Sequence, residues 1–172
     1  MIRAAAHCPR IVTAEFESST QARLQALRDL HYPAERNRVP AHLTLFHHLP
    51  PSVDAELVGR LKRATAARPP LAELAGVQPL EEGVAYRVSS PALAAIREEL
   101  ADAFAGLLGP DDLRLWSPHV TIQNKVKPRE AKALQAELAK DFRPAACKVA
   151  ALRLWAYRDG PWQALGRFPF RL

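Results

Sequence analysis

The alternation of apolar and polar residues predicts strands and amphipathic helices that take turns along the chain. Strict alternation with β-branched residues is typical of a strand, and apolar residues three or four apart are typical of a helix. These patterns predict strands at 10–17, 41–49, 71–80, 83–89, 119–126 and, as two segments, within 148–172. They predict helices at 18–31, 52–67, 89–109 and 127–142.

Residues with special backbone preferences mark the ends of the expected helices. Serine caps, first-turn prolines and a closing glycine are expected at Ser18 or Ser19, Ser52, Ser89 or Ser90, Pro91, Gly109 and Pro128. Within the first helix, Leu24, Leu27 and Leu30 fall on one stripe and are expected to face the core.

The order of elements predicts an α+β fold with a repeated plan. Strand, helix, strand, helix, strand occurs once in each half of the chain. A hairpin is expected at 71–89, and another at the Asp159-Gly160 turn, which argues for antiparallel rather than doubly wound parallel sheets. Since 172 residues suit one domain and no long linker divides them, 1–172 is expected to be a single domain of two pseudo-symmetric halves.

Two similar tetrapeptides, "HLTL" at 42–45 and "HVTI" at 119–122, occupy equivalent strands of the two halves. Because side chains alternate along a strand, His42 and Thr44 share one face while the leucines between them point to the core. The same holds for His119 and Thr121. If an approximate two-fold relates the halves, the two histidines and two threonines surround one site.

Two histidines facing one phosphate suit general acid–base cleavage of a phosphoester. The ordinary pKa of imidazole is near 6.5, so at neutral pH one ring can accept a proton while the other donates one. The threonine hydroxyls can bind the non-bridging phosphate oxygens. No carboxylate cluster that would hold magnesium lies near either motif, so no metal or other cofactor is expected. Either histidine can take either role, and water or a 5′-hydroxyl can serve as the nucleophile.

These residues resemble the two-histidine (2H) phosphoesterase superfamily, which includes 2′-5′ RNA ligases and cyclic phosphodiesterases. The flanking segments "VPAHLTLFHHLP" and "PHVTIQNKV" are similar to its small bacterial members. The resemblance implies a bilobal fold, with two antiparallel-sheet lobes and flanking helices around a central groove. It also implies metal-independent chemistry on a 2′,3′-cyclic phosphate or a 2′-5′ linkage, with RNA termini or a small cyclic nucleotide as partner. It assigns His42 and His119 as catalytic residues and Thr44 and Thr121 as phosphate-binding residues.

Several weaker candidates surround the motifs. If both strands continue straight, the groove face extends to Phe46, His48, Gln123 and Lys125. The cationic candidates for substrate binding are Lys125, Arg38 and Arg36. The aromatic candidates for base stacking, with core packing as the commoner role of such residues, are Trp116, Trp155 and Tyr157.

Two other functions compete with the enzymatic one. The formal net charge of +6 and the pI of about 9.7 favour an anionic partner, so a non-catalytic RNA- or nucleotide-binding module with the same groove is the main alternative. A metal hydrolase that uses His42, His47 and His48 is the second.

Composition adds the expected setting. No segment approaches the roughly 20 apolar residues of a membrane span, and the start lacks the apolar stretch of a secretory signal, so a cytoplasmic protein without membrane contact is expected. Cys8 and Cys147 are expected to be reduced thiols. A monomer is expected because one chain holds both halves of the site.

Overall fold

The computed structural model describes residues 5–158 and 160–171. Within these ranges the strands are β1 (Arg10–Phe16), β2 (Leu43–Leu49), β3 (Leu71–Leu80), β4 (Gly83–Ser89), β5 (His119–Gln123), β6 (Ala145–Ala156) and β7 (Gln163–Pro169). The α-helices are α2 (Ser18–His31), α3 (Asp54–Ala64), α4 (Pro91–Ala103), α5 (Pro110–Leu113) and α6 (Pro128–Lys140). Short 3₁₀ turns occupy Ala34–Arg36 and Pro51–Val53.

All recorded strand pairs are antiparallel, and the strands close on themselves. Their order is β1-β2-β5-β4-β3-β6-β7, and β6 also pairs with β1. Since β6 is long, its first part pairs with β3 and its later part with both β1 and β7. The result is a barrel-like sheet, and the α+β prediction is confirmed.

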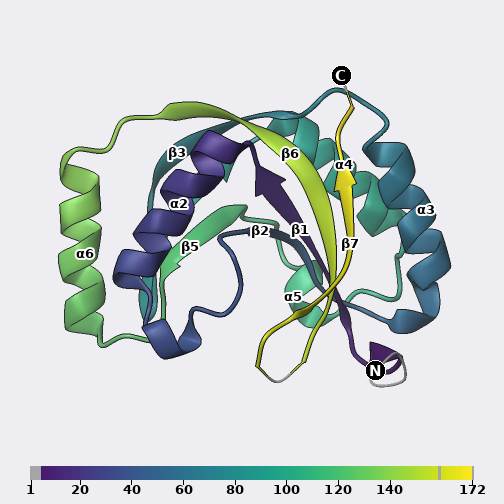
Figure 1. Ribbon diagram of the computed structural model, residues 1–172, viewed down its shortest axis with the longest axis horizontal. Coiled ribbons are helices and arrows are strands. Elements are labelled where there is room, and N and C mark those ends of the chain that lie inside the picture. The colour runs from purple at the N-terminus through teal and green to yellow at the C-terminus, as the bar shows by residue number, and fades with distance from the viewer. Residues whose placement is uncertain (1–4, 159, 172) are drawn as a thin grey trace.

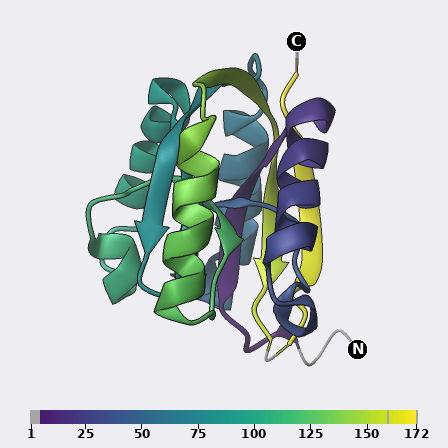
Figure 2. The ribbon, with the colours of Figure 1, turned by 90° about the vertical axis from the view of Figure 1, so that its left-hand side faces the viewer.

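The helices flank the sheet at opposite ends. Figures 1 and 2 show α2 and α6 together at one end of the molecule, and α3 and α4 at the other. α6 packs on β3 and β4, whereas α2, which precedes the first motif strand, packs on β5, the second. The short α5, from the second half, packs on β2, so each motif strand contacts a helix from the other half of the chain.

The two motif strands are neighbours at the centre of the fold. The register pairs Leu43 of β2 with Val120 of β5, and both side chains are fully buried. They belong to one hydrophobic core that also contains Leu45 and Ile122, the other apolar residues of the two tetrapeptides. The expected alternation of buried and groove-facing residues is thus correct within each tetrapeptide.

Close backbone approach fixes the far end of β5. Gly83 opens β4 at the turn of the expected hairpin, and a Cβ atom there would collide with the carbonyl group of Gln123. Only glycine lets β4 lie this close to the second motif strand.

The predicted helix ends are partly right. The Ser90 hydroxyl accepts a hydrogen bond from the Leu93 N–H (3.2 Å), as expected of a cap, and Pro91 and Pro128 open their helices. Neither Ser18 nor Ser19 caps α2, because Glu17 precedes the helix without a side-chain bond, and Ser52 lies inside a 3₁₀ turn. Gly109 does not end the third helix: α4 stops at Ala103, and Gly109 precedes the short α5.

The expected apolar stripe of α2 is wrong at its last position. Leu24 is fully buried, but Leu30 is 74% exposed. Arg28 lies four residues after Leu24 and is buried in place of Leu30. An inward position of α2 is thus occupied by a cation, which donates a hydrogen bond to β5.

Three further expectations concern the last hairpin, the thiols and membrane-spanning helices. β6 and β7 pair as expected, but Asp159 of the predicted turn lies outside the described residues. Cys147 is a buried free thiol in β6, where burial raises its pKa. None of the described helices has the length and apolar character that a membrane span requires.

The Leu43 pairing predicts a clear stability difference. Leu43→Ala should lower the free energy of unfolding by about 3 kcal/mol, because it leaves a cavity between the paired motif strands. Leu30→Ala, the same change at an exposed position, should lower it by less than about 0.5 kcal/mol. Urea denaturation of both variants measures this, and equal losses would contradict the central place of Leu43.

Candidate active site

The strand register brings the two His-x-Thr motifs together. Extending the Leu43–Val120 pair by one residue in each direction places His42 opposite Thr121 and Thr44 opposite His119. The two histidines therefore lie diagonally across a two-strand patch, each facing the threonine of the other motif. All four residues line one pocket of about 430 Å³, which we call the motif pocket.

Both imidazoles are fixed in the same way. Nδ1 of His42 lies 2.7 Å from the Pro40 carbonyl oxygen, and Nδ1 of His119 lies 2.7 Å from the Ser117 carbonyl oxygen. A carbonyl only accepts, so each Nδ1 carries a hydrogen and donates it. The neutral ring then has its lone pair on Nε2, the nitrogen that is left for a substrate. In both motifs the acceptor is the residue two positions before the histidine, so the two halves orient their histidines in the same way.

The surroundings of His42 favour its neutral form. Burial lowers the pKa of His42 from its ordinary 6.5 to about 4, against the opposing effect of the Pro40 bond. The positive charge of Arg28 and the neighbouring His119 and His47 lower it further. Trp162 packs on the ring with centroids 4.9 Å apart and planes tilted by 57°. At neutral pH, His42 is therefore able to accept a proton.

Arg28 links α2 to the second motif strand. Its guanidinium donates to the Thr121 carbonyl oxygen (3.1 Å) and to the Asn37 Oδ1 (2.8 Å), and it lies 4.0 Å from the centre of the Tyr32 ring. This is why a cation occupies the inward face of α2. The sequence contained one signal for the inward position of Arg28, its spacing of four residues from Leu24. A search for apolar residues alone misses this signal because arginine is not apolar.

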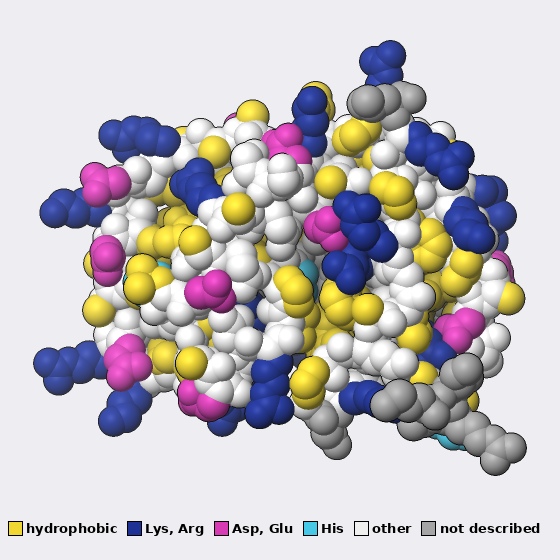
Figure 3. All heavy atoms as spheres, in the orientation of Figure 1, with side chains coloured by type: hydrophobic (Ala, Val, Ile, Leu, Met, Phe, Trp, Pro, Cys, Tyr) yellow, Lys and Arg dark blue, Asp and Glu magenta, His cyan; other side chains and the backbone are white. Residues whose placement is uncertain are grey.

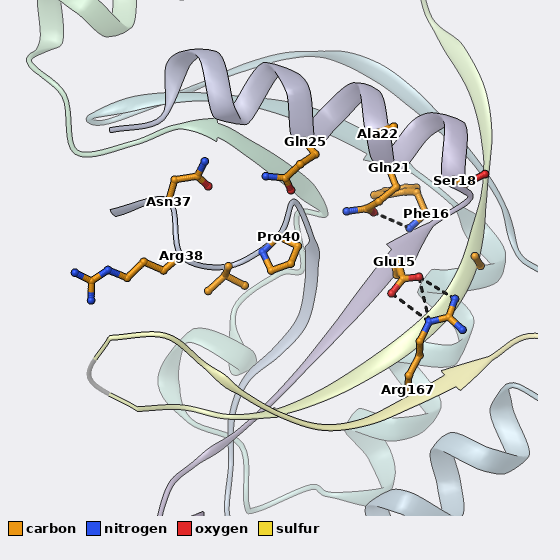
Figure 4. A pocket seen from close by; sticks show the side chains of 12 residues that line it. Glu15, Phe16, Ser18, Gln21, Ala22, Gln25, Asn37, Arg38, Pro40 and Arg167 are labelled. Carbon is orange, nitrogen blue, oxygen red and sulfur yellow. Dashed lines mark hydrogen bonds and ion pairs between the residues drawn. The ribbon is translucent and has the colours of Figure 1, made fainter. Parts of the chain in front are cut away.

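Two glutamines of α2 hold the backbone just before His42. Gln21 Nε2 donates to the Ala41 carbonyl oxygen, and the Ala41 N–H donates to Gln25 Oε1, both at 2.7 Å. Figure 4 shows these side chains reaching from α2 toward the loop that carries Arg38 and Pro40. They lie beside a separate cavity of about 660 Å³, which neither His42 nor His119 lines. Both backbone polar groups of Ala41 are thus satisfied, which orders the approach to the first motif.

The motif pocket has an apolar wall beside His119. The Trp116 indole donates to the Thr44 carbonyl oxygen (3.0 Å), so this ring is tied to the first motif strand. Leu115 lines the same pocket although it is 98% exposed. Three polar side chains, Asp111, Arg114 and Ser117, line the motif pocket as well.

A second pocket of about 430 Å³ adjoins the first and shares His42 and Thr121 with it. We call it the basic pocket, because three arginines line it: Arg28, Arg36 and Arg38. Tyr32 and Trp162 give it aromatic surface. The sequence pointed to Arg36 and Arg38 but missed Arg28 and Trp162.

Other candidates lie away from the two pockets. Lys125 has a positive φ of 61°, and its Nζ lies 3.0 Å from Glu82, so it pairs with the β3–β4 turn rather than lining either pocket. Trp155 is buried and donates to the Thr13 hydroxyl (2.9 Å), whereas Tyr157 is 44% exposed. Figure 3 shows cationic side chains interspersed with acidic ones on the viewed face, not gathered into one patch.

Straight continuation of β2 is wrong beyond Leu45. Phe46, expected on the groove face, is fully buried, and His47 and His48 are both exposed. Gln123, expected on the same face in β5, is buried as well. In the described part of the chain, no group of three or more His, Cys, Asp or Glu residues is placed to hold a metal ion, so the proposed triad of His42, His47 and His48 does not form.

Comparison with known proteins identifies the family of the chain. A profile of the 2′-5′ RNA ligase superfamily matches residues 16–161, and the chain belongs to that superfamily. The resemblance to 2H phosphoesterases drawn from the two motifs is thereby confirmed, and with it a phosphoesterase- or RNA ligase-like class of protein.

Solved structures share the fold at low sequence identity. TT0787 of Thermus thermophilus is 18% identical with a TM-score of 0.67, over 95% of this chain and 98% of that one. E. coli LigT complexed with 3′-AMP is 16% identical with a TM-score of 0.59, over 96% and 99%. A structure described as a phosphoesterase is 17% identical with a TM-score of 0.57, over 96% and 99%. No curated protein sequence matches the chain.

The depressed pKa of His42 predicts a specific loss of stability in acid. In the unfolded chain the pKa returns to about 6.5, so between pH 6.5 and 4 the unfolded state binds more protons than the folded state. The contribution of His42 to the free energy of unfolding is therefore fully present above pH 6.5 and is lost as the pH falls toward 4. For a partly enclosed ring the loss is on the order of 2 kcal/mol.

Two measurements check this. NMR titration of the His42 ring should give an inflection near pH 4, and one near 6.5 would contradict the assignment. In urea denaturation, His42→Gln should lose less stability than the wild type when the pH falls from 7 to 4.5, because the variant lacks the titrating ring.

Proposed function

We propose that this protein is a metal-independent phosphoesterase that acts on 2′,3′-cyclic phosphate or 2′-5′-linked RNA or nucleotides. The observation that supports it best is the single pocket lined by His42, Thr44, His119 and Thr121. The matching Nδ1 bonds leave two Nε2 atoms for one substrate phosphate. E. coli LigT, which shares the fold, has been crystallised with 3′-AMP and with phosphate, which is consistent with a nucleotide at this site.

The proposed chemistry divides the roles of the histidines. His42 is neutral at pH 7 and takes the proton of the attacking water at Nε2. The oxygen forms a bond to phosphorus, and the P–O bond to the ribose 2′ or 3′ oxygen breaks. His119 takes part in its protonated form, with a hydrogen on both ring nitrogens, and gives the Nε2 proton to the departing oxygen. Thr44 and Thr121 donate to the non-bridging oxygens, where negative charge collects. The same displacement with a 5′-hydroxyl in place of water is ligation.

The two pockets fit opposite sides of an in-line displacement. His42 lies where the motif and basic pockets meet, whereas His119 lines only the motif pocket. Attacking and leaving oxygens lie on opposite sides of the phosphorus. The nucleophile therefore approaches from the basic pocket, and the ribose whose hydroxyl is freed occupies the motif pocket. For ligation, Arg36 and Arg38 are placed to bind the phosphates of the RNA strand that brings the 5′-hydroxyl.

An assay on 2′,3′-cyclic nucleotides and RNA with a cyclic phosphate end tests this proposal. Activity should persist in excess EDTA, because none of the steps uses a metal. His42→Ala and His119→Ala should each lower kcat roughly 100- to 10,000-fold, the usual contribution of general acid–base catalysis. His31→Gln, at the end of α2 and outside both pockets, serves as the matched control and should keep full activity.

The same assay separates the alternative of a non-catalytic binding module. Such a module would show no turnover in the wild type, and its salt-dependent RNA affinity would change little in either histidine variant. Full activity in both His42→Ala and His119→Ala would overturn the enzymatic proposal. A monomeric, cytoplasmic protein of two related halves remains our prediction for its wider setting.

A further inference from the structure

A third histidine faces the motif pocket because β2 is bulged. From the Thr13–Thr44 pair to the Val12–Phe46 pair, β1 advances one residue and β2 two, and a second extra residue of β2 follows before Leu49. Leu45 and Phe46 are therefore both buried, and His47 is turned outward. In a regular strand His47 would face the core. Bulges of this kind re-aim a side chain and are common next to active sites.

Asp112 holds the bulge in place from a distant part of the chain. Its carboxylate, only 1% exposed, accepts hydrogen bonds from the backbone N–H groups of His47 and His48, at 2.8 to 3.0 Å. It also accepts from the His47 ring at Nδ1 (3.0 Å). Burial by itself would raise the pKa of Asp112, but these bonds lower it below its usual range, so the group is a carboxylate at neutral pH.

The His47 ring is held but not enclosed. Its side chain is 54% exposed and lines the same pocket as His42, Thr44 and His119. Because Nδ1 donates to Asp112, the ring offers Nε2 to that pocket, as an acceptor when neutral and as a donor when protonated. Arg114 lines the pocket as well.

We propose that His47, supported by Asp112 and joined by Arg114, forms a subsite for a second phosphate of the substrate: the 5′-phosphate of the nucleotide whose ribose hydroxyl is freed beside His119. The inference rests on the proposed function. It makes His47 a residue that selects nucleotides or RNA ends carrying a 5′-phosphate over nucleoside cyclic phosphates that lack one.

The position of the subsite follows from the chemistry of the motif pocket. The ribose lies on the His119 side, and its 5′ substituent extends within the same pocket, whose remaining charged or imidazole side chains are His47, Arg114 and the carboxylate of Asp111. Arg114 alone is a weak anchor, since it is mostly exposed and lies 3.6 Å from Asp111. His47 is pre-oriented by a buried partner, which reduces the entropy lost when it binds a phosphate.

The test compares two substrates: adenosine 2′,3′-cyclic phosphate with and without a 5′-phosphate. In the wild type, the 5′-phosphate should raise kcat/KM roughly tenfold, mainly through KM, as expected of one charge-assisted hydrogen bond. His47→Gln should reduce this advantage, the ratio of kcat/KM with and without the 5′-phosphate, to about twofold or less. Asp112 is left unchanged because the bulge depends on it.

His48→Gln is the matched control. His48 is the next residue on the same bulge and is also exposed, but its side chain is not among those that line the motif pocket. It should keep the tenfold preference. A general disturbance of the bulge would change the activity on both substrates alike and leave their ratio unchanged, whereas loss of the subsite lowers that ratio in His47→Gln alone.

The outcomes separate the two proposals. Equal activity of the wild type on both substrates, or an undiminished preference in His47→Gln, overturns the subsite and leaves the phosphoesterase proposal standing. Absence of hydrolysis of both substrates by the wild type overturns the proposed function and the subsite with it.

Discussion

The antiparallel pairing of Leu43 with Val120 is the contact on which the site depends. One register pair sets the relation of two segments that are distant in the chain, and both side chains are sealed in the core. Because alternate residues face opposite sides, this single pair places two histidines and two threonines on the other face. A one-residue slip would send the polar residues of one motif into the core, so the free energy of burial protects the geometry of the site.

Two buried arginines reinforce this arrangement from opposite sides. Arg28 of α2 donates to the Thr121 carbonyl oxygen in β5, and Arg97 of α4 donates to the Leu45 carbonyl oxygen in β2 (3.3 Å). Each half of the chain thus sends a cation from its first helix to the motif strand of the other half. Arg97 donates to the Asp112 carbonyl oxygen as well (2.7 Å), and Arg28 lowers the pKa of His42. The contacts that join the halves therefore also tune the groups that face the substrate.

The sequence predicted what depends on local pattern. The alternation within 42–45 and 119–122 was enough to place the four motif side chains, and the apolar periodicities located most helices and strands. The hairpin at 71–89 was predictable from its turn residues. The N-cap of α4 was predictable from the serines that precede Pro91. These features are set by neighbours a few positions away.

Features set by distant partners were not predictable in this way. The bulge that buries Phe46 depends on β1 and on Asp112, 65 residues away from His47. Arg28 is inward because a carbonyl of β5 needs a donor there. None of these partners is visible in a window of sequence.

Whether two imidazoles share one phosphate is tested most directly by ¹⁵N NMR during titration with inorganic phosphate. The Nε2 signals of His42 and His119 should shift together, with one dissociation constant and a stoichiometry of one phosphate per chain. A response of only one ring, or two rings that respond with separate dissociation constants, would contradict the shared site.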